Sequence, residues 1–430
     1  MKCAPGCCML DGYQASPEAG PVRTPSLLRQ LLPFPRLVVE KARIDGTQRL
    51  VVDVRARGRP RCPGCHRKAP IYDRRPPREW RHLDFGGRQV ILRATTLRRV
   101  QCARCGTIRV EEVSWAAPDS DFTRPFEDQV AWLLQHCDKT TISQLMRIAW
   151  RTVGSIASRV VDRCRLPIDV DQLSVLGVDE ISFRKGHHYL TLVTDHGSGR
   201  VIWAREGRSA GTLAAFFAEI GSEACARIQW VTIDMSAAYR KAIEEHLPNA
   251  QIIYDRFHVQ KLLSGAVDET RRALWRESKG TPEGDAMKRS RWPLLKRPWH
   301  LLPEQELKLQ EIARTNRRLY SAYLLKEEFA MIYDSLAYPE QAQSAIESWL
   351  RSASRSRNSA FIRAAQTIRR HLDGILALFK TGYTSGRCEG INTKARLATR
   401  QAFGFHSPSA VLAMIELRCG GIAVRLPQVA

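Results

Sequence analysis

The sequence predicts a multidomain α+β protein built around a mixed α/β core, and three observations carry that prediction. Two Cys-x-x-Cys pairs stand among short alternating strands near the N-terminus. A basic segment with helical periodicity follows them. Strands and helices then alternate between residues 169 and 264, with acidic residues in or directly after apolar strands. A long basic helical segment separates this core from a final helical part.

Length and charge limit the functions open to the chain. Its 430 residues predict two to four domains, and its formal net charge is +23. Residues 1–175 carry 30 Lys and Arg against 18 Asp and Glu, whereas residues 176–270 carry 10 against 12. The two remaining segments, 271–375 and 376–430, have net charges of +8 and +5. A near-neutral centre between basic segments is typical of a protein that holds a polyanion outside its reaction centre.

The N-terminal residues and the cysteines indicate an intracellular chain without membrane spans. No apolar run approaches the roughly 18 residues of a spanning helix, and the apolar region of a signal peptide is missing. The twelve cysteines are therefore expected to be thiols and metal ligands. Residues 1–34 lack periodicity and are predicted to be a poorly ordered leader, whose Cys3, Cys7 and Cys8 are not expected to bind metal.

Residues 35–118 are predicted to form a zinc ribbon. Two alternating runs flank Asp45-Gly46, which is a strong hairpin signal. Two Cys-x-x-Cys pairs at the ends of β-ribbons match a structural zinc site, with these ligands: Cys62, Cys65, Cys102 and Cys105. Redox pairs are the alternative, and the many arginines favour zinc. The spacing is long, so residues 67–87 must leave the ribbon as an excursion.

Residues 119–168 switch to helical period and are predicted to form a helix-turn-helix. A helix over residues 126–136 precedes a short helix that Thr141 opens with a capping box. The next helix, from Thr152, would read the DNA major groove. Its polar side carries the predicted DNA contacts, which are Ser155, Ser158 and Arg159. A plain helical hairpin is the alternative, and the basic charge favours the helix-turn-helix.

Residues 169–264 are predicted to be the first part of the α/β core. Its strands are expected at residues 176–183, 188–194 and 200–204, before Asp234, and within 250–263. Helices follow the third and fourth strands. Three antiparallel strands, a helix, a strand, a helix and another strand is the order of the ribonuclease-H-like fold. An all-helical insertion at residues 265–375 would interrupt this core, and residues 376–430 would complete it.

Three acidic residues stand where metal ligands are expected: Asp179, Asp234 and Glu389. A carboxylate inside a buried strand is costly unless a positive partner meets it. Two Mg²⁺ (or Mn²⁺) ions about 3.5–4 Å apart need a bridging carboxylate and one further acid each, and Asp179 suits the bridge. Glu180 should point to the opposite face of the strand and is left out of this set. The alternative is that the acids simply sit in water at strand ends.

These motifs resemble those of DDE-type transposases of bacterial insertion sequences, in particular the ISL-three family. The resemblance covers about residues 34–420. It rests on LGVDE around Asp179, TIDM around Asp234, YDRFHVQK, and SGRCEGINTKARLATRQAFGF around Glu389. It implies metal-dependent cleavage of double-stranded DNA at terminal inverted repeats, followed by strand transfer to target DNA. It also implies a homodimer or larger assembly on the DNA, in the bacterial cytoplasm at the nucleoid.

The resemblance adds candidate supporting residues. Asp255 and His258 match an acidic-x-x-His element near the site of several transposase families, although Asp255 could equally be a helix cap. Lys394 and Arg396 follow Glu389 and could hold phosphates, or could form a solvated helix face.

The basic insertion is expected to clamp DNA. One of two tryptophans between prolines, Trp292 or Trp299, is predicted to stack on a displaced base. The alternative is that these residues, with Trp275 and Trp349, are all core. For the whole chain, a zinc-containing transcriptional regulator or a structure-selective nuclease are the rival functions.

Overall fold

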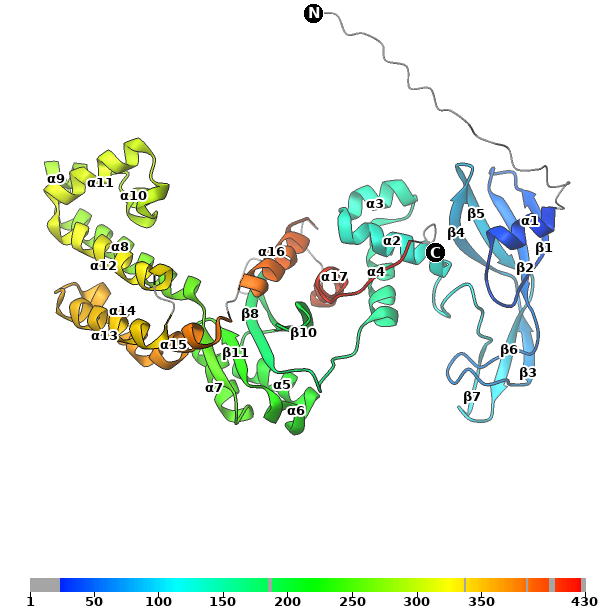
Figure 1. The fold of residues 1–430 in the computed structure, drawn as a ribbon. Helices are drawn as coiled ribbons and strands as arrows, with labels where there is room; N and C mark the ends of the chain where they lie inside the picture. Colours follow the sequence, from blue (N-terminus) through cyan, green and yellow to red (C-terminus); the bar gives the residue numbers. More distant parts are fainter. Residues whose placement is uncertain (1–23, 185–187, 336–337, 384–385, 402–406, 427–430) are drawn as a thin grey trace, which may run out of the picture. The chain divides into compact units, whose positions relative to one another are not determined.

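The computed structural model describes residues 24–184, 188–335, 338–383, 386–401 and 407–426 (Figure 1). The chain divides into two compact units: Met1–His136 with Val424–Ala430, and Cys137–Ala423. Each unit has its own arrangement of helices and strands. The boundary falls inside the predicted helix-turn-helix segment, between its first and second helices.

The first unit contains a four-stranded sheet in the order β1-β2-β5-β4. Its strands are β1 (Leu37–Ile44), β2 (Leu50–Ala56), β4 (Arg78–Phe85) and β5 (Arg88–Ala94). β1 and β2 pair antiparallel with Ile44 opposite Leu50, so the hairpin predicted at Asp45-Gly46 is confirmed. The Trp80 and Trp115 rings pack edge to face in the core of this sheet, with centroids 5.7 Å apart.

A smaller sheet carries the cysteine pairs. It has the order β3-β6-β7, with β3 at Ile71–Arg75, β6 at Leu97–Cys102 and β7 at Thr107–Val110. The predicted excursion at residues 67–87 is not a plain loop, since it supplies β3 to this sheet and β4 to the larger one. Helix α2 (Arg124–His136) follows, close to its predicted bounds.

The predicted leader is ordered at its end. Residues 1–23, with Cys3, Cys7 and Cys8, lie outside the described residues. Helix α1 (Thr24–Leu31) packs against β1, and Leu32 is buried in the core. The leader prediction for residues 24–34 is therefore corrected: apolar side chains on one helix face, missed because the segment is short, hold it to the sheet.

The second unit begins with two helices joined by a three-residue turn. These are α3 (Lys139–Met146) and α4 (Trp150–Cys164). Asp138, not Thr141, is the N-cap of α3, and its side chain accepts hydrogen bonds from the backbone N–H groups of Thr140 and Thr141. Arg147 takes the left-handed conformation (φ 53°) that ends α3. One face of α4 is buried and packs on α17 (Pro408–Cys419).

A five-stranded sheet in the order β10-β9-β8-β11-β12 forms the centre of this unit. Its strands are β8 (Val175–Arg184), β9 (His188–Asp195), β10 (Arg200–Glu206), β11 (Trp230–Ile233) and β12 (Gln251–Tyr254). The first three pair antiparallel, and β11 runs parallel to both β8 and β12. The strand order along the chain is as predicted, although the fifth strand is only four residues long.

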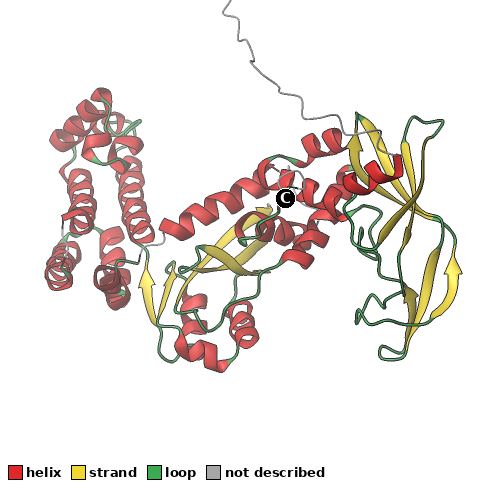
Figure 2. Cartoon of the chain, turned by 45° about the vertical axis from the view of Figure 1, so that its right-hand side comes forward, coloured by secondary structure: helices red, strands yellow, loops and turns green. Residues whose placement is uncertain are grey.

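Helices cover both faces of this sheet (Figures 1 and 2). On one face lie α5 (Ala210–Ile220), α6 (Ser222–Arg227) and α7 (Ala237–His246). On the other lie α16 (Gly386–Gln401) and α17, with α16 against β8 and α17 against β10. Ser407 caps α17 by accepting from the N–H of Ala410.

The segment between β12 and α16 is helical. It comprises α8 (Arg256–Glu277), α9 (Pro282–Ala286), α10 (Arg291–Leu295), the 3₁₀ turn η1 (Pro298–His300), α11 (Pro303–Thr315), α12 (Arg317–Ser335), α13 (Pro339–Arg355), α14 (Ser359–Arg370) and α15 (Leu372–Thr381). α15 packs directly on β12 at Gly374, where an added Cβ would come within 2.5 Å of the Tyr254 ring. This close approach joins the helical segment to the sheet edge.

The tryptophans of this segment divide into two groups. Trp349 is 3% exposed and donates its indole N–H to the Leu325 carbonyl at 2.7 Å, and Trp275 is partly buried against the same core. Trp292 and Trp299 are 61% and 64% exposed. Among the described helices, none is long and apolar enough to cross a membrane.

Candidate active site and zinc centre

Two of the predicted acids meet at the centre of the sheet. Asp179 lies within β8, and Asp234 is the first residue after β11. Thr232 is in register with Gly177 across the parallel pair, so two residues further on Asp234 comes beside Asp179. Asp234 is oriented by its own turn, because its Oδ1 accepts from the N–H of Ser236 at 3.0 Å.

Helix α16 joins the third acid to the first. Asn392 is 3% exposed and donates a hydrogen bond from Nδ2 to Oδ2 of Asp179. Its Oδ1 has no hydrogen-bond partner within the described part of the chain. Glu389 lies one turn earlier on the same helix face. Asn392 is not among the predicted site residues, and its spacing of three residues after Glu389 is the signal that could have identified it.

Electrostatic interactions connect these acids with the other predicted side chains. Burial raises the pKa of Asp179, while His258 and Arg396 oppose that increase. Burial and the nearby Asp255 carboxylate raise the pKa of Glu389, again opposed by His258. The structure therefore brings most of the predicted site residues into one neighbourhood.

Asp255 stands at the start of α8. It precedes α8 as the N-cap residue, but its side chain makes no capping hydrogen bond. It is 6% exposed, and burial raises the pKa of its carboxyl group. The nearby backbone N–H groups of Phe257 and Arg256 and the charges of His258 and Arg256 oppose that rise.

Lys394 and Arg396 lie in different surroundings. Arg396 is close enough to lower the pKa values of Asp179 and Glu389. Lys394 instead lines a separate cavity of about 430 Å³ that also includes Arg200 and Arg418. The structure brings only Arg396 to the acids, because two residues along a helix turn a side chain to another face.

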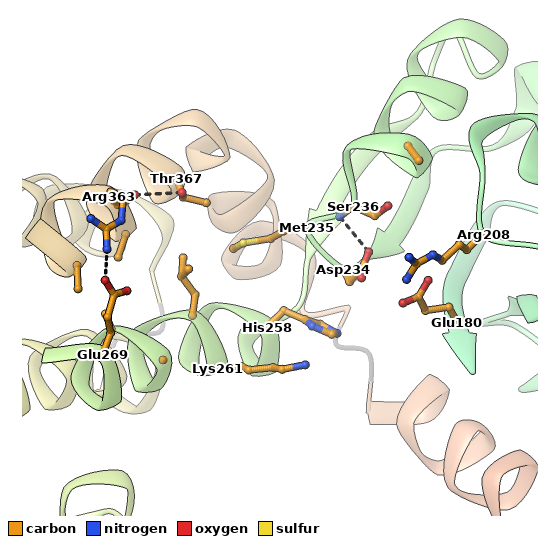
Figure 3. A pocket seen from close by; sticks show the side chains of 16 residues that line it. Glu180, Arg208, Asp234, Met235, Ser236, His258, Lys261, Glu269, Arg363 and Thr367 are labelled. Carbon is orange, nitrogen blue, oxygen red and sulfur yellow. Dashed lines mark hydrogen bonds and ion pairs between the residues drawn. The ribbon is translucent and has the colours of Figure 1, made fainter. Parts of the chain in front are cut away.

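Glu180 joins the site through a cavity. It lines a cavity of about 840 Å³ together with Asp234 and His258, and Figure 3 shows its carboxylate next to Asp234 and Arg208. Burial raises the pKa of Glu180, and Asp234 raises it further. Alternation along the strand explains why Glu180 does not share the contact of Asp179 with Asn392. That alternation did not predict that Asp234 and Glu180 line the same cavity.

The acidic residues fit a divalent metal by their chemistry. Carboxylate oxygens are the ligands that Mg²⁺ prefers, and the unpartnered Oδ1 of Asn392 adds a buried oxygen beside them. Among the described residues, the cysteine set alone converges as a ligand group of three or more within 4.8 Å. The predicted acids are neighbours, but among the described residues their carboxylate oxygens do not converge on one point as the cysteine sulfurs do.

The four cysteines converge on a tetrahedral zinc site. The Sγ atoms of Cys62 and Cys105 are 3.8 Å apart, and those of Cys65 and Cys102 are 3.5 Å apart. Zn–S bonds of about 2.3 Å in a tetrahedron separate sulfur atoms by about 3.8 Å. The backbone N–H of Cys105 lowers the pKa of Cys102 to about 7, which favours the thiolate form. The neighbouring thiols of Cys65 and Cys102 raise the pKa of Cys105, so the fit to Zn²⁺ rests on the spacing of the sulfur atoms.

The predicted DNA contacts of α4 lie on its outer side. Ser155 is exposed, and Ser158 and Arg159 are half-buried. The two serine hydroxyls lie 3.4 Å from the carbonyl oxygens one turn earlier, at Arg151 and Gly154. Arg151 is exposed at the start of the helix, one turn before Ser155, and extends this polar face.

Comparisons with known proteins agree with this organisation. Residues 58–105 match the zinc finger of transposases IS204/IS1001/IS1096/IS1165, and residues 111–161 match the helix-turn-helix domain of transposase family ISL3. Residues 176–415 match the transposase domain of the same family.

Two curated relatives extend over most of the chain. The transposase for insertion sequence element IS1557 of Mycobacterium tuberculosis is 39% identical over 391 residues, which cover 85% of this chain and 87% of that protein. The transposase for insertion sequence element IS1001 of Bordetella parapertussis is 31% identical over 315 residues, or 72% of this chain and 76% of that protein. These matches confirm the resemblance predicted from the motifs: the chain belongs to the ISL3 (ISL-three) family of transposases.

Proposed function

We propose that this transposase cuts DNA at the terminal inverted repeats of its element and transfers the freed ends to target DNA, using Asp179, Asp234 and Glu389. The observation that carries the proposal is the position of Asp179 within β8 and of Asp234 directly after β11, the strand that runs parallel beside β8. The helix that bears Glu389 is held to Asp179 through Asn392. In this proposal, a strand, the turn after a second strand and a helix supply the carboxylates that would hold the metal ions.

The sheet topology supports a ribonuclease-H-like core. Three antiparallel strands are followed by two parallel strands on the other side of β8, with helices on both faces. In this interpretation, the core comprises residues 169–264 and 376–430, and the helices of residues 265–375 are an insertion. The separate C-terminal part contributes the third acid.

The acids suit two Mg²⁺ or Mn²⁺ ions, which when bound would activate the attacking oxygen and stabilise the leaving oxygen of an in-line displacement. The residues of the chain have other tasks. Asn392 orients the Asp179 carboxylate, while His258 and Arg396 offset the accumulated negative charge. The buried Asp255 keeps His258 in position by charge attraction.

DNA recognition is assigned to the N-terminal half and to the insertion. The zinc ribbon and the outer face of α4, with Ser155, Ser158 and Arg159, would bind the terminal repeat. The exposed rings of Trp292 and Trp299 lie near cations, since the guanidinium groups of Arg291 and Arg297 are 5.5 and 4.4 Å from their centroids. Such a pairing of ring and cation suits a contact with a DNA strand.

The test uses the purified protein and DNA ends taken from the sequence that flanks its gene. With Mg²⁺, the wild type should cleave at the repeat and join the end to a plasmid. Asp179→Asn, Asp234→Asn and Glu389→Gln should each lose both steps by at least about a thousandfold, since each removes a metal ligand, while end binding persists. Asp195→Asn, at the end of β9, is the matched control.

Three outcomes would redirect the proposal. Strand transfer by any of the three variants at the wild-type rate removes that residue from the site. Binding without any cleavage by the wild type would favour a DNA-binding regulator, whereas cleavage at branched DNA without strand transfer would favour a nuclease.

A further inference from the structure

The 840 Å³ cavity extends well beyond the acids, and the proposed reaction leaves that part unused. Figure 3 shows three zones along it. Asp234, Glu180 and Arg208 stand at one end, and His258 and Lys261 follow on α8. At the other end, Arg363 of α14 forms an ion pair with Glu269 of α8.

Small and apolar groups line the space between the charged ends. From the sheet side and α8 come Met235, Leu262, Gly265 and Ala266, and from α14 come Ala360 and Ala364. An added Cβ at Gly265 would meet no atom within 4 Å. The middle of the cavity is therefore an open, apolar space between two helices.

Size and chemistry select the kind of group that this space can hold. A groove of about 840 Å³ that is open to solvent has the size of a small-molecule site. Lys261 and Arg208 are the cations that line the cavity near Glu180, and the Arg208 guanidinium lies over the Tyr189 ring at 4.2 Å. Cations beside an apolar slot match the phosphate and the base of one nucleotide.

We propose that this cavity receives one nucleotide displaced from the duplex next to the bond that is cut. The inference deepens the proposed function and rests on it. The phosphate lies against Lys261 and Arg208, close to Asp234. The base enters the apolar slot above Gly265, where contact with aliphatic groups offsets part of the cost of unstacking.

The Arg363–Glu269 pair closes the slot with groups that can read a base edge. A guanidinium donates to guanine acceptors, and a carboxylate accepts from the amino group of cytosine. The two side chains are 55% and 56% exposed, so the pair adds little to stability. A polar pair at the end of an apolar slot thus supplies base preference.

The test fills the slot. Gly265→Leu places a side chain in the open space, and Ser344→Leu, at an exposed position of α13, is the matched control. Cleavage is measured on DNA ends with an abasic site placed in turn at each position beside the cut. On intact DNA, Gly265→Leu should cleave about tenfold or more slowly than the wild type and the control, because the base has no place to go.

One abasic position should restore cleavage by Gly265→Leu to near the wild-type rate. A 2-aminopurine at that same position should brighten on binding to the wild type in Ca²⁺, and much less on binding to Gly265→Leu. Equal melting temperatures of the two leucine variants establish that folding is intact. Arg363→Gln should lower the cleavage rate on DNA ends with the preferred base at that position. The cleavage rate on ends with the other bases should not change.

Two results overturn the inference. Cleavage by Gly265→Leu at the rate of the Ser344→Leu control shows that the slot stays empty. A defect that no abasic position relieves shows that the leucine acts on something other than a displaced base. Both are measured against a wild type that cleaves and transfers the same ends, so failure of the proposed function would be visible separately.

Discussion

At the residue scale, the proposed catalytic acids could be predicted from the sequence, and the residues that support them could not. Asp179 and Asp234 stand out because a carboxylate in an apolar strand is costly. Asn392 is unremarkable in sequence, since an asparagine on a helix is usually solvated. Only the packing of α16 on β8 turns it into a buried partner of Asp179. The surroundings of Glu180 also depend on packing, because its neighbours Asp234 and Arg208 come from other parts of the chain.

Asn392→Ala should lower the affinity for the Mg²⁺ that cleavage requires more than it lowers the stability of the fold. Without its amide, the Asp179 carboxylate loses the hydrogen bond that orients it. Loss of such a supporting residue typically costs about 10–100-fold in metal affinity or activity. We expect the Mg²⁺ concentration for half-maximal cleavage to rise by a factor in that range. Thr393→Ala, at the exposed neighbouring position on α16, is the control, and an equal Mg²⁺ dependence of both variants would contradict the prediction.

His82 should make the first unit sensitive to acid. Its ring lies beside Phe34, its Nδ1 is 2.8 Å from the Thr123 hydroxyl, and burial lowers its pKa to about 4. As pH falls from about 6.5 to about 4, the unfolded chain therefore binds a proton that the folded chain refuses, and stability is lost. A shift of this size corresponds to roughly 3 kcal/mol.

The measurement compares urea unfolding of the zinc-loaded wild type and His82→Gln between pH 4 and 7.5. The wild type should lose more stability than the variant across the lower half of that range, and the two should run parallel above pH 7. Acid release of zinc affects both proteins alike. Parallel curves throughout would show that the folded protein accepts the proton.

At the element scale, residue spacing predicted the turns and hairpins formed by residues close together in the sequence. The pairing of strands far apart in the sequence could not be predicted in this way. The hairpin at Asp45-Gly46 and the Cys-x-x-Cys turns follow from local rules. The division of residues 67–87 between two sheets could not be predicted, because strand pairing depends on partners far along the chain. Helix α3 begins directly after Asp138, because the Asp138 side chain accepts hydrogen bonds from two backbone N–H groups of the first turn. The predicted capping box at Thr141 is not used as the start of the helix.

Removal of zinc should unfold the β3-β6-β7 sheet. Structural zinc contributes folding free energy directly, about 10–16 kcal/mol in isolated zinc fingers, and this sheet has a core of only a few buried side chains. Elemental analysis should find one zinc per chain in the wild type. Cys62→Ser and Cys102→Ser should lose the zinc and bind the terminal repeat more weakly. Cys137→Ser, outside the cluster, should keep both properties, and zinc retained by Cys102→Ser would exclude the proposed site.

At the scale of the whole molecule, charge separates binding from chemistry. The positive charge lies mainly in residues 1–175 and 271–375, which would hold DNA. Residues 176–270 are nearly neutral and contain two of the three proposed catalytic acids, Asp179 and Asp234. A net charge of +23 gives affinity for any DNA, and this affinity should fall steeply with salt. We expect the contacts that recognise the terminal repeat to come from the zinc ribbon and α4, because phosphate contacts alone carry no base information.

A single chain has one set of the three acids, but transposition joins two element ends to one target. We therefore expect two or more chains to assemble on paired ends, each cutting one of them. Mixing wild type with Asp234→Asn tests this. Cleavage of single ends should fall in proportion to the wild-type fraction, whereas joining of both ends should fall as its square, because both chains of an assembly must be active. A linear fall of paired-end joining would mean that one chain processes both ends in turn.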